Sequence, residues 1–165
     1  MLHNPDMDIF IIFGAKYLYL VIVITALVYV FRQPKELRWK IVICAAVALP
    51  LTYIAAKIAS YFYYDPRPFV IGQFTPLLPH APDNGFPSDH TLFGSAIAAV
   101  ISYFHRRLGL MLFGVAFAVG ASRVFAGIHH FIDIFGSIAI AFVMTYLVFT
   151  YVSPKLHRYI AQKFF

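Results

Sequence analysis

The stretch Ile9–Phe31, IFIIFGAKYLYLVIVITALVYVF, decides the fold because it contains 23 residues and a single charged side chain, Lys16. A helix of about 20 apolar residues is long enough to cross the hydrocarbon core of a bilayer. Four more apolar stretches follow along the chain: Ile41–Tyr64, Ser88–Phe104, Leu108–Ala126 and Ile134–Val152. All five have lengths within the range of about 17–25 residues that spans a membrane. The sequence therefore predicts an all-α, polytopic membrane helical bundle with five transmembrane helices.

The composition of the whole chain agrees with a membrane protein. Its 165 residues are 61% hydrophobic and 12% charged, and the mean hydropathy is +0.77. Soluble domains contain about 25% charged residues, so this chain has too few polar side chains to cover a globule in water. The composition excludes an ordinary soluble enzyme and a disordered chain, and it argues against nucleic acid as a partner despite the net charge of +6. No repeat or long linker divides the sequence, so we expect residues 1–165 to form a single domain in contact with membrane lipids.

The order of the charges predicts how the helices cross the membrane. Nine of the 13 Lys and Arg residues lie in the connection after the first stretch, the turn after the third, and the C-terminal tail. These nine are Arg32, Lys35, Arg38, Lys40, Arg106, Arg107, Lys155, Arg158 and Lys163. Six of the seven acidic residues lie at the opposite ends of the stretches. Since cytoplasmic loops are enriched in Lys and Arg, we expect the N-terminus outside and the C-terminus in the cytoplasm.

Four cations remain near the outer ends of the predicted helices: Lys16, Lys57, Arg67 and Arg123. An ionisable side chain within a membrane span is costly and is by default a candidate functional residue. Lys16 is explained more simply as a side chain that extends outward to the membrane surface. For Lys57 two interpretations stay open: it pairs with an acidic residue or reaches the surface, or it binds an anion.

Three polar patterns fall on this same outer side. The first is Lys57 followed by Tyr-Tyr-Asp-Pro-Arg-Pro at 63–68, and the second is Phe-Pro-Ser-Asp-His-Thr at 86–91. The third is Ser122-Arg123, then five residues, His129, three residues and Asp133. A proline-rich connection, residues 65–87, joins the first two patterns, and a loop of this length in a compact chain is usually functional.

Each pattern has a chemical interpretation. The cations Lys57, Arg67 and Arg123 suit a phosphate or diphosphate better than a single carboxylate. Ser88 could cap the third predicted helix and leave backbone N–H groups directed at an anion. These features predict an anion-binding site on the outer side.

The two histidines near this site predict phosphoryl chemistry. His129 and Asp133 are four residues apart, so on a helix they share a face. Asp133 could accept the Nδ1 proton of His129 and leave Nε2 free as a nucleophile, while His90 could act as general acid. A metal site formed by His90, His129 and Asp133 is the alternative, but neighbouring cations would repel a metal ion. We therefore predict a site without a metal or another cofactor.

The three patterns together resemble the signatures of the type 2 phosphatidic acid phosphatase superfamily. Ser122-Arg123, His129 and Asp133 match its third signature, Pro87-Ser88-Asp89-His90 resembles its Pro-Ser-Gly-His signature, and Lys57 with Arg67-Pro68 resembles its lysine–arginine-proline signature. Two departures are visible: Asp89 replaces the usual glycine, and nine residues rather than six separate Lys57 from Arg67. These departures and Pro79-His80-Ala81 are similar to undecaprenyl-diphosphatases of the bacitracin-resistance type.

The resemblance implies roles for the matched residues and a substrate. His129 would form a phosphohistidine, Asp133 would orient it, and His90 would be the general acid. The phosphoryl oxygens would be bound by Lys57, Arg67, Ser88 and Arg123. Asp89 would contribute its backbone N–H, while its carboxylate would repel phosphate unless it pairs with a cation or stays protonated. The family implies a six-helix-type core, here with five spans. The substrate would be a polyprenyl diphosphate lipid of a bacterial plasma membrane, hydrolysed at the outer face for reuse as a carrier in cell wall biogenesis.

Three alternatives stay open at this point. The substrate could be another lipid phosphate, such as phosphatidylglycerophosphate or phosphatidate. The chain could transfer the phosphoryl group to a membrane acceptor. A small anion transporter is disfavoured because transporters usually show paired repeats, which this sequence lacks.

Overall fold

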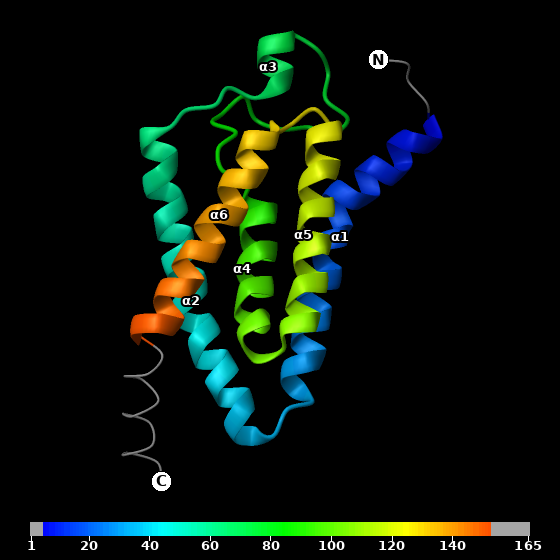
Figure 1. Cartoon of the computed structure of the whole chain (residues 1–165). Helices are drawn as coiled ribbons and strands as arrows, with labels where there is room; N and C mark the ends of the chain where they lie inside the picture. The colour runs from blue at the N-terminus through cyan, green and yellow to red at the C-terminus, as the bar shows by residue number, and fades with distance from the viewer. Residues whose placement is uncertain (1–4, 153–165) are drawn as a thin grey trace.

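The computed structural model describes residues 5–152, which form six α-helices and one π-helical turn. The helices are α1 (Pro5–Phe31), α2 (Lys35–Phe62), α3 (Pro68–Gly72), α4 (Asp89–Phe104), α5 (Arg106–Phe125) and α6 (Phe131–Leu147), and the turn is η1 (Val148–Val152). Five long helices correspond to the five predicted stretches. The sixth, α3, has only five residues and lies in the connection between α2 and α4 (Figure 1).

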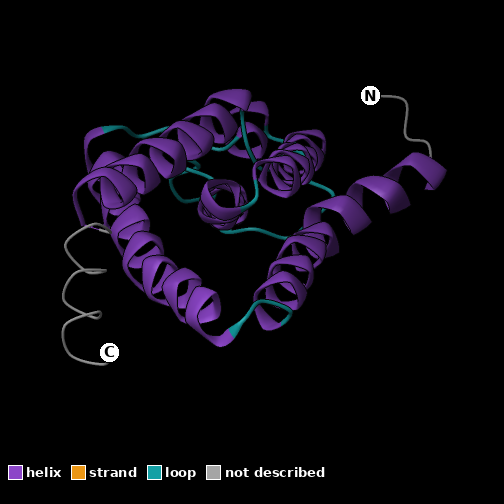
Figure 2. Cartoon of the chain, turned by 60° about the horizontal axis from the view of Figure 1, so that its bottom comes forward, coloured by secondary structure: helices purple, strands orange, loops and turns teal. Residues whose placement is uncertain are grey.

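Four of the five long helices are long and apolar enough to cross a membrane: α1, α2, α5 and α6 together with its π-helical continuation. Helix α4 has 16 residues, which at about 1.5 Å per residue give about 24 Å, so it is shorter than the predicted span. It contacts all four other long helices, and Figure 2 shows these helices arranged around a central one. The short helix is therefore enclosed mainly by protein.

Pro50 lies inside α2 and does not end the helix. The helix runs without interruption from Lys35 to Phe62 with Pro50 inside it. Neighbouring helices and local adjustment can satisfy the backbone groups that a proline frees within a membrane span. The prediction that this apolar run forms one helix is confirmed.

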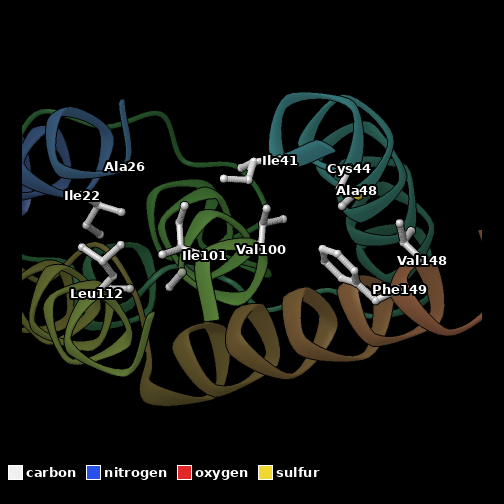
Figure 3. Close-up of a cluster of buried hydrophobic side chains, with 12 residues drawn as sticks. Ile22, Ala26, Ile41, Cys44, Ala48, Val100, Ile101, Leu112, Val148 and Phe149 are labelled. Atoms are coloured by element: carbon white, nitrogen blue, oxygen red, sulfur yellow. The ribbon is translucent and has the colours of Figure 1, made fainter. Parts of the chain in front are cut away.

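The main core lies between α1, α2, α4, α5 and η1. Figure 3 shows the cluster on both sides of α4: Ile22 of α1 lies on the side of Ile101, and Phe149 of η1 lies on the side of Val100. Because side chains from residues 22 to 149 meet in this cluster, it ties the first helix to the last.

Small residues let α4 and α5 come close to their neighbours. A Cβ placed on Gly120 of α5 would meet the Cγ2 methyl of Ile134 at 2.5 Å and the Thr91 hydroxyl at 2.9 Å. Such close backbone approach is typical of helix packing in membranes. This packing brings the ends of α4, α5 and α6 together where the candidate site lies.

The outer faces of the long helices carry many exposed apolar side chains. Phe10 is 77% exposed, Tyr61 is 85% exposed and Phe142 is 60% exposed. Exposed apolar surface of this extent marks contact with a membrane or a partner. The exposed faces of the candidate spans indicate that lipid surrounds the bundle.

The two ends of the bundle differ in charge. Figure 1 places the α1–α2 and α4–α5 turns at one end, where Arg32, Lys35 and Arg106 lie. The opposite end holds the α2–α4 connection with α3, the α5–α6 connection and the start of α1. The tail cations Lys155, Arg158 and Lys163 lie outside the described residues. The cations predicted to face the cytoplasm that the structure describes therefore lie at one end of the bundle, and the candidate site lies at the other.

Candidate active site

The site is built around His129, which lies in the short connection between α5 and α6. Gly127 has a φ of 78°, a left-handed conformation that favours glycine, and it turns the chain after α5. His129 then precedes α6, with its Nδ1 3.0 Å from Asp133 Oδ2. Both side chains are buried, at 2% and 0% exposure. The structure thus brings this predicted pair together at the start of α6 rather than on the side of a continuous helix.

The other imidazole nitrogen of His129 faces a guanidinium. Arg67 Nη1 lies 3.4 Å from His129 Nε2 and also donates to the Ile128 carbonyl at 2.8 Å. Arg67 Nη2 donates to the Asn84 carbonyl at 3.3 Å, and its Nε donates to Asp83 Oδ1 at 2.7 Å. Arg67 is only 5% exposed. A buried cation is therefore held at the atom expected to attack phosphorus.

Burial and the neighbouring cations set the protonation of His129. Loss of hydration is the main cause that lowers the pKa of its imidazole to about 2, and the charges of Arg123 and Arg67 lower this pKa further. A buried imidazole near positive charges is more stable without its second proton. His129 is therefore neutral near pH 7 and can act as a nucleophile through the nitrogen that carries no proton.

Arg123 is the second buried guanidinium of the site. It is 6% exposed, and its Nη1 donates to the carbonyl of Ala15 at 3.4 Å. Its Nε is buried without a hydrogen-bond partner among the described residues. Since an unpaired buried donor is costly, this N–H is available to an anion that enters the site.

The start of α4 contributes the predicted Ser88, Asp89 and His90. Ser88 precedes α4 and is buried, but its side chain does not cap the helix; its Oγ instead accepts a hydrogen bond from Thr91 at 3.2 Å. Asp89 begins the helix and is exposed. The His90 ring packs edge-on against Tyr19 of α1, with ring centroids 5.1 Å apart. Helix α1 therefore supports the site, which the sequence patterns did not predict.

Lys57, a predicted anion-binding residue, lies on the exposed face of α2. It is exposed on α2, and its Nζ lies 5.0 Å from the centre of the Tyr53 ring. The preceding residue, Ala56, is buried, so Lys57 belongs to the outward stripe that includes Tyr53 and Tyr61. Among the described residues, Lys57 makes no hydrogen bond or ion pair with the other predicted site residues, so its role in the site stays a prediction. Neither Asp65 nor Asp133, its suggested acidic partners, is paired with it: both contact histidines.

Asn84 is a site residue that the sequence patterns missed. Its Oδ1 accepts hydrogen bonds from the backbone N–H groups of Asp65 and Phe86, at 2.9 and 3.0 Å. Its Nδ2 donates to Ser60 Oγ and to the Tyr63 carbonyl. Asn84 thus joins the end of α2 to the proline-rich connection and fixes the segment that carries Arg67.

The family of the chain follows from a comparison with known proteins. The model of the PAP2 superfamily matches residues 39–156, which include the site residues of α4, α5 and α6 and their connections. This chain belongs to the PAP2 superfamily.

Two curated relatives and one solved structure give the likeness in more detail. The chain is 36% identical to undecaprenyl-diphosphatase BcrC of Bacillus subtilis over 61% of its own length and 54% of that protein. It is 31% identical to the bacitracin transport permease protein BcrC of Bacillus licheniformis over 87% of its length and 70% of that protein. The crystal structure of Aquifex aeolicus LpxE is similar with a TM-score of 0.72 and 25% identity, covering 91% of this chain and 89% of that one. The chain thus spans about half the length of the first of these relatives.

Two further polar residues, Asp65 and His130, lie next to Asp133 of the third PAP2 signature. His130 Nδ1 is 2.8 Å from Asp65 Oδ2, and the His130 backbone N–H donates to Asp133 Oδ2 at 2.9 Å. Asp65, His130 and Asp133 stand close enough to hold a metal ion. They differ from the metal set considered from the sequence, which combined His90, His129 and Asp133. Asp133 Oδ2 accepts bonds from both histidines, which fits a carboxylate that positions His129, while its buried Oδ1 has no hydrogen-bond partner among the described residues.

Proposed function

We propose that this PAP2 protein is a lipid diphosphatase that converts undecaprenyl diphosphate to undecaprenyl phosphate and inorganic phosphate through a phosphohistidine on His129. The observation that carries the proposal is the environment of His129. Its Nδ1 faces Asp133 at 3.0 Å, and its Nε2 lies beside Arg67 at 3.4 Å. A neutral imidazole oriented by a carboxylate and placed next to a buried cation is suited to attack a phosphoryl group.

In the first proposed step, His129 Nε2 attacks the terminal phosphorus of the diphosphate. The N–P bond forms while the bond to the bridging oxygen breaks, and the electron pair leaves with the lipid monophosphate. His90 donates a proton to that leaving oxygen. Arg67 and Arg123 bind the equatorial oxygens, whose negative charge they stabilise.

In the second proposed step, a water molecule attacks the phosphohistidine. His90, which gave up its proton in the first step, accepts a proton from this water. The N–P bond breaks, its electron pair returns to His129, and inorganic phosphate leaves. Asp133 holds the Nδ1 side of the imidazole throughout, so His129 returns to its starting tautomer.

The choice of a diphosphate rests on charge and on the relatives. A diphosphate headgroup carries about three negative charges near pH 7, which suits a site with two buried guanidinium groups. The Bacillus subtilis relative is named an undecaprenyl-diphosphatase. The lipid tail would stay in the bilayer beside the exposed apolar helices, which supports a membrane lipid as substrate. A role in carrier recycling for the cell wall, with bacitracin resistance as its consequence, follows from this substrate.

The orientation belongs to the same proposal. The bacterial relatives support a location in a bacterial plasma membrane. The charge pattern of the turns supports the site on the outer face, the N-terminus outside and the C-terminus in the cytoplasm. We also propose that the reaction uses no metal or other cofactor, because the buried guanidinium groups supply the positive charge that a metal would provide.

A comparison of substrates with purified protein tests the function. Phosphate release is measured in one detergent with undecaprenyl diphosphate, phosphatidylglycerophosphate and phosphatidate. The proposal requires the diphosphate to react fastest, with activity that persists in a chelator and that vanadate inhibits as a mimic of the five-coordinate phosphorus. Faster release from a glycerophospholipid would overturn the substrate and leave the phosphatase chemistry in place. Activity that a chelator abolishes and a divalent ion restores would overturn the cofactor-free mechanism.

Two alternative activities are separated by the products. A phosphotransferase would yield lipid monophosphate with less than one equivalent of inorganic phosphate when a membrane acceptor is present. The alternative of a small anion transporter predicts no phosphate release at all. Equal amounts of lipid monophosphate and inorganic phosphate support the hydrolase.

A further inference from the structure

His80 lies beside the nucleophile although it belongs to none of the PAP2 signature patterns. It stands in the connection between α3 and α4, and its ring meets the His129 ring in an edge-on arrangement with centroids 6.3 Å apart. Its side chain is 28% exposed, whereas that of His129 is 2% exposed. His80 is therefore the more exposed of the two neighbouring rings and lies nearer the surface than His129.

The two buried guanidinium groups, Arg67 and Arg123, differ in how many hydrogen bonds they already make. Arg67 donates to Asp83, Ile128 and Asn84. Arg123 has its unpaired Nε in the buried part of the site. These two guanidinium groups suit the phosphoryl group that His129 attacks. A second phosphate, bonded to the first and nearer the solvent, would lie at the rim.

The exposed polar side chains near the buried cations include His80, Asp83 and Asp89. Asp83 Oδ1 binds Arg67 at 2.7 Å, and His80 Nδ1 is 4.0 Å from the same oxygen, beyond the range of a good hydrogen bond. His80 is thus not committed to Asp83. Burial is the main cause that lowers the pKa of the His80 imidazole, and the charge of Arg67 adds to it. The single negative charge of an inner phosphate would offset this effect and favour an N–H donor on His80.

We propose that His80 donates a hydrogen bond to the inner phosphate of a bound lipid diphosphate and so favours diphosphates over lipid monophosphates. In a monophosphate, the tail oxygen and its first methylene groups would occupy this place and offer His80 less negative charge. The inference rests on the proposed function. It adds a specificity-determining residue to the reaction and involves no covalent step at His80.

The test compares farnesyl diphosphate with farnesyl monophosphate for the unmodified protein, His80→Ala and His80→Gln in one detergent. A hydrogen bond to a charged group corresponds to about tenfold or more in affinity. We expect His80→Ala to lower kcat/KM for the diphosphate about tenfold and that for the monophosphate less than twofold. His80→Gln keeps an N–H donor and should recover part of the preference. His105→Asn, at the opposite end of the bundle, is the control, because Asn preserves the N-cap that His105 gives to α5.

Two inhibitors separate binding from chemistry. Vanadate mimics the transferred phosphoryl group alone, whereas methylenediphosphonate also presents a second phosphonate. His80→Ala should weaken inhibition by methylenediphosphonate about tenfold and leave inhibition by vanadate within twofold. Equal loss for both farnesyl substrates, or unchanged inhibition by methylenediphosphonate, would overturn the role of His80 while the proposed function stands. An unmodified protein that does not prefer the diphosphate would instead overturn the proposed substrate and the inference together.

Discussion

At the scale of single residues, the chemistry of His129 depends on burial and on its neighbours. Its side chain is 2% exposed, its Nδ1 faces Asp133, and both Arg67 and Arg123 oppose a second proton on the ring. The same environment that makes the imidazole a neutral nucleophile also affects folding. Whatever lowers the pKa of a group in the folded state makes the stability of that state depend on pH.

This linkage predicts a loss of stability in acid. The pKa of His129 is about 2 in the folded protein and about 6.5 in the unfolded chain. The unfolded chain therefore binds a proton between these pH values and the folded protein does not. The contribution is fully present above pH 6.5 and falls by about 1.4 kcal/mol per pH unit below it. Thermal unfolding in detergent at pH 7, 6 and 5 should show Tm decreasing more steeply for the unmodified protein than for His129→Gln. Parallel decreases would contradict the assignment.

Asp83 gives a second prediction at this scale. Its carboxylate is 62% exposed and pairs with Arg67 Nε, so it partly neutralises a cation that the substrate needs. Exposed ion pairs are worth about 0.2–1 kcal/mol, so removing this charge should tighten substrate binding by less than about fivefold. We expect Asp83→Asn to lower KM at constant kcat in steady-state assays. A raised KM would show that Asp83 positions Arg67 rather than competing for it.

At the scale of elements, the sequence predicts the long helices well because each presents an apolar run of sufficient length. Helix α6 begins at Phe131 rather than at the predicted Ile134, since Asp133 in its first turn interrupts the apolar run. Helix α3 has five residues, which is too short to show a periodic pattern. Helix α4 has 16 residues, fewer than the four candidate spans, and it packs against all four other long helices.

In the candidate site, too, local contacts could be predicted from the sequence, whereas contacts between distant segments could not. The contact of His129 with Asp133 is local, so spacing was enough to predict it. The contact of Arg67 with His129 joins residues 62 apart, and the packing of Tyr19 on His90 depends on how α1 crosses α4. For Lys57, the position in the sequence suggested a residue that binds an anion. The rotation of α2 about its axis instead directs its side chain outward, next to Tyr53. Contacts set by helix crossing and rotation could not be inferred from spacing.

Helix packing gives a prediction with a matched control. A methyl group at Gly120 would meet Ile134 and Thr91 within 3 Å, whereas a methyl group at Gly114 of the same helix would meet no atom within 4 Å. Overpacking costs about 1–3 kcal/mol, and alanine favours a helix over glycine by up to about 1 kcal/mol. Gly120→Ala should therefore lower Tm, and Gly114→Ala should leave it equal or raise it. A Tm that does not change for Gly120→Ala would contradict the close packing of α5 on α4 and α6.

At the scale of the whole molecule, the site and the basic turns lie at opposite ends of the bundle (Figure 1). The substrate of the proposed reaction is a membrane lipid, so the side that bears the site decides which leaflet supplies it. In the proposed reaction, the exposed apolar faces on the long helices would let a lipid tail remain in the bilayer while the headgroup binds Arg67 and Arg123.

Labelling of single cysteines tests the orientation. Thr75 and Glu36 are both exposed, in the connection after α3 and in the first turn of α2. In intact cells a membrane-impermeant thiol reagent should modify Thr75→Cys and should reach Glu36→Cys only after the membrane is opened. The unmodified chain, whose Cys44 is buried, gives the background. The reverse pattern would place the site on the cytoplasmic face.

The most direct test of the central claim is to identify the phosphorylated residue during turnover. The protein is mixed with farnesyl diphosphate, quenched in alkali and analysed by mass spectrometry, with His90→Ala included because loss of the general base should slow breakdown of the intermediate. We predict a phosphoryl group on His129, in greater amount in His90→Ala and absent from His129→Ala, which should release no phosphate. Phosphate release by His129→Ala, or a phosphoryl group on another residue, would contradict the assignment of His129 as the nucleophile.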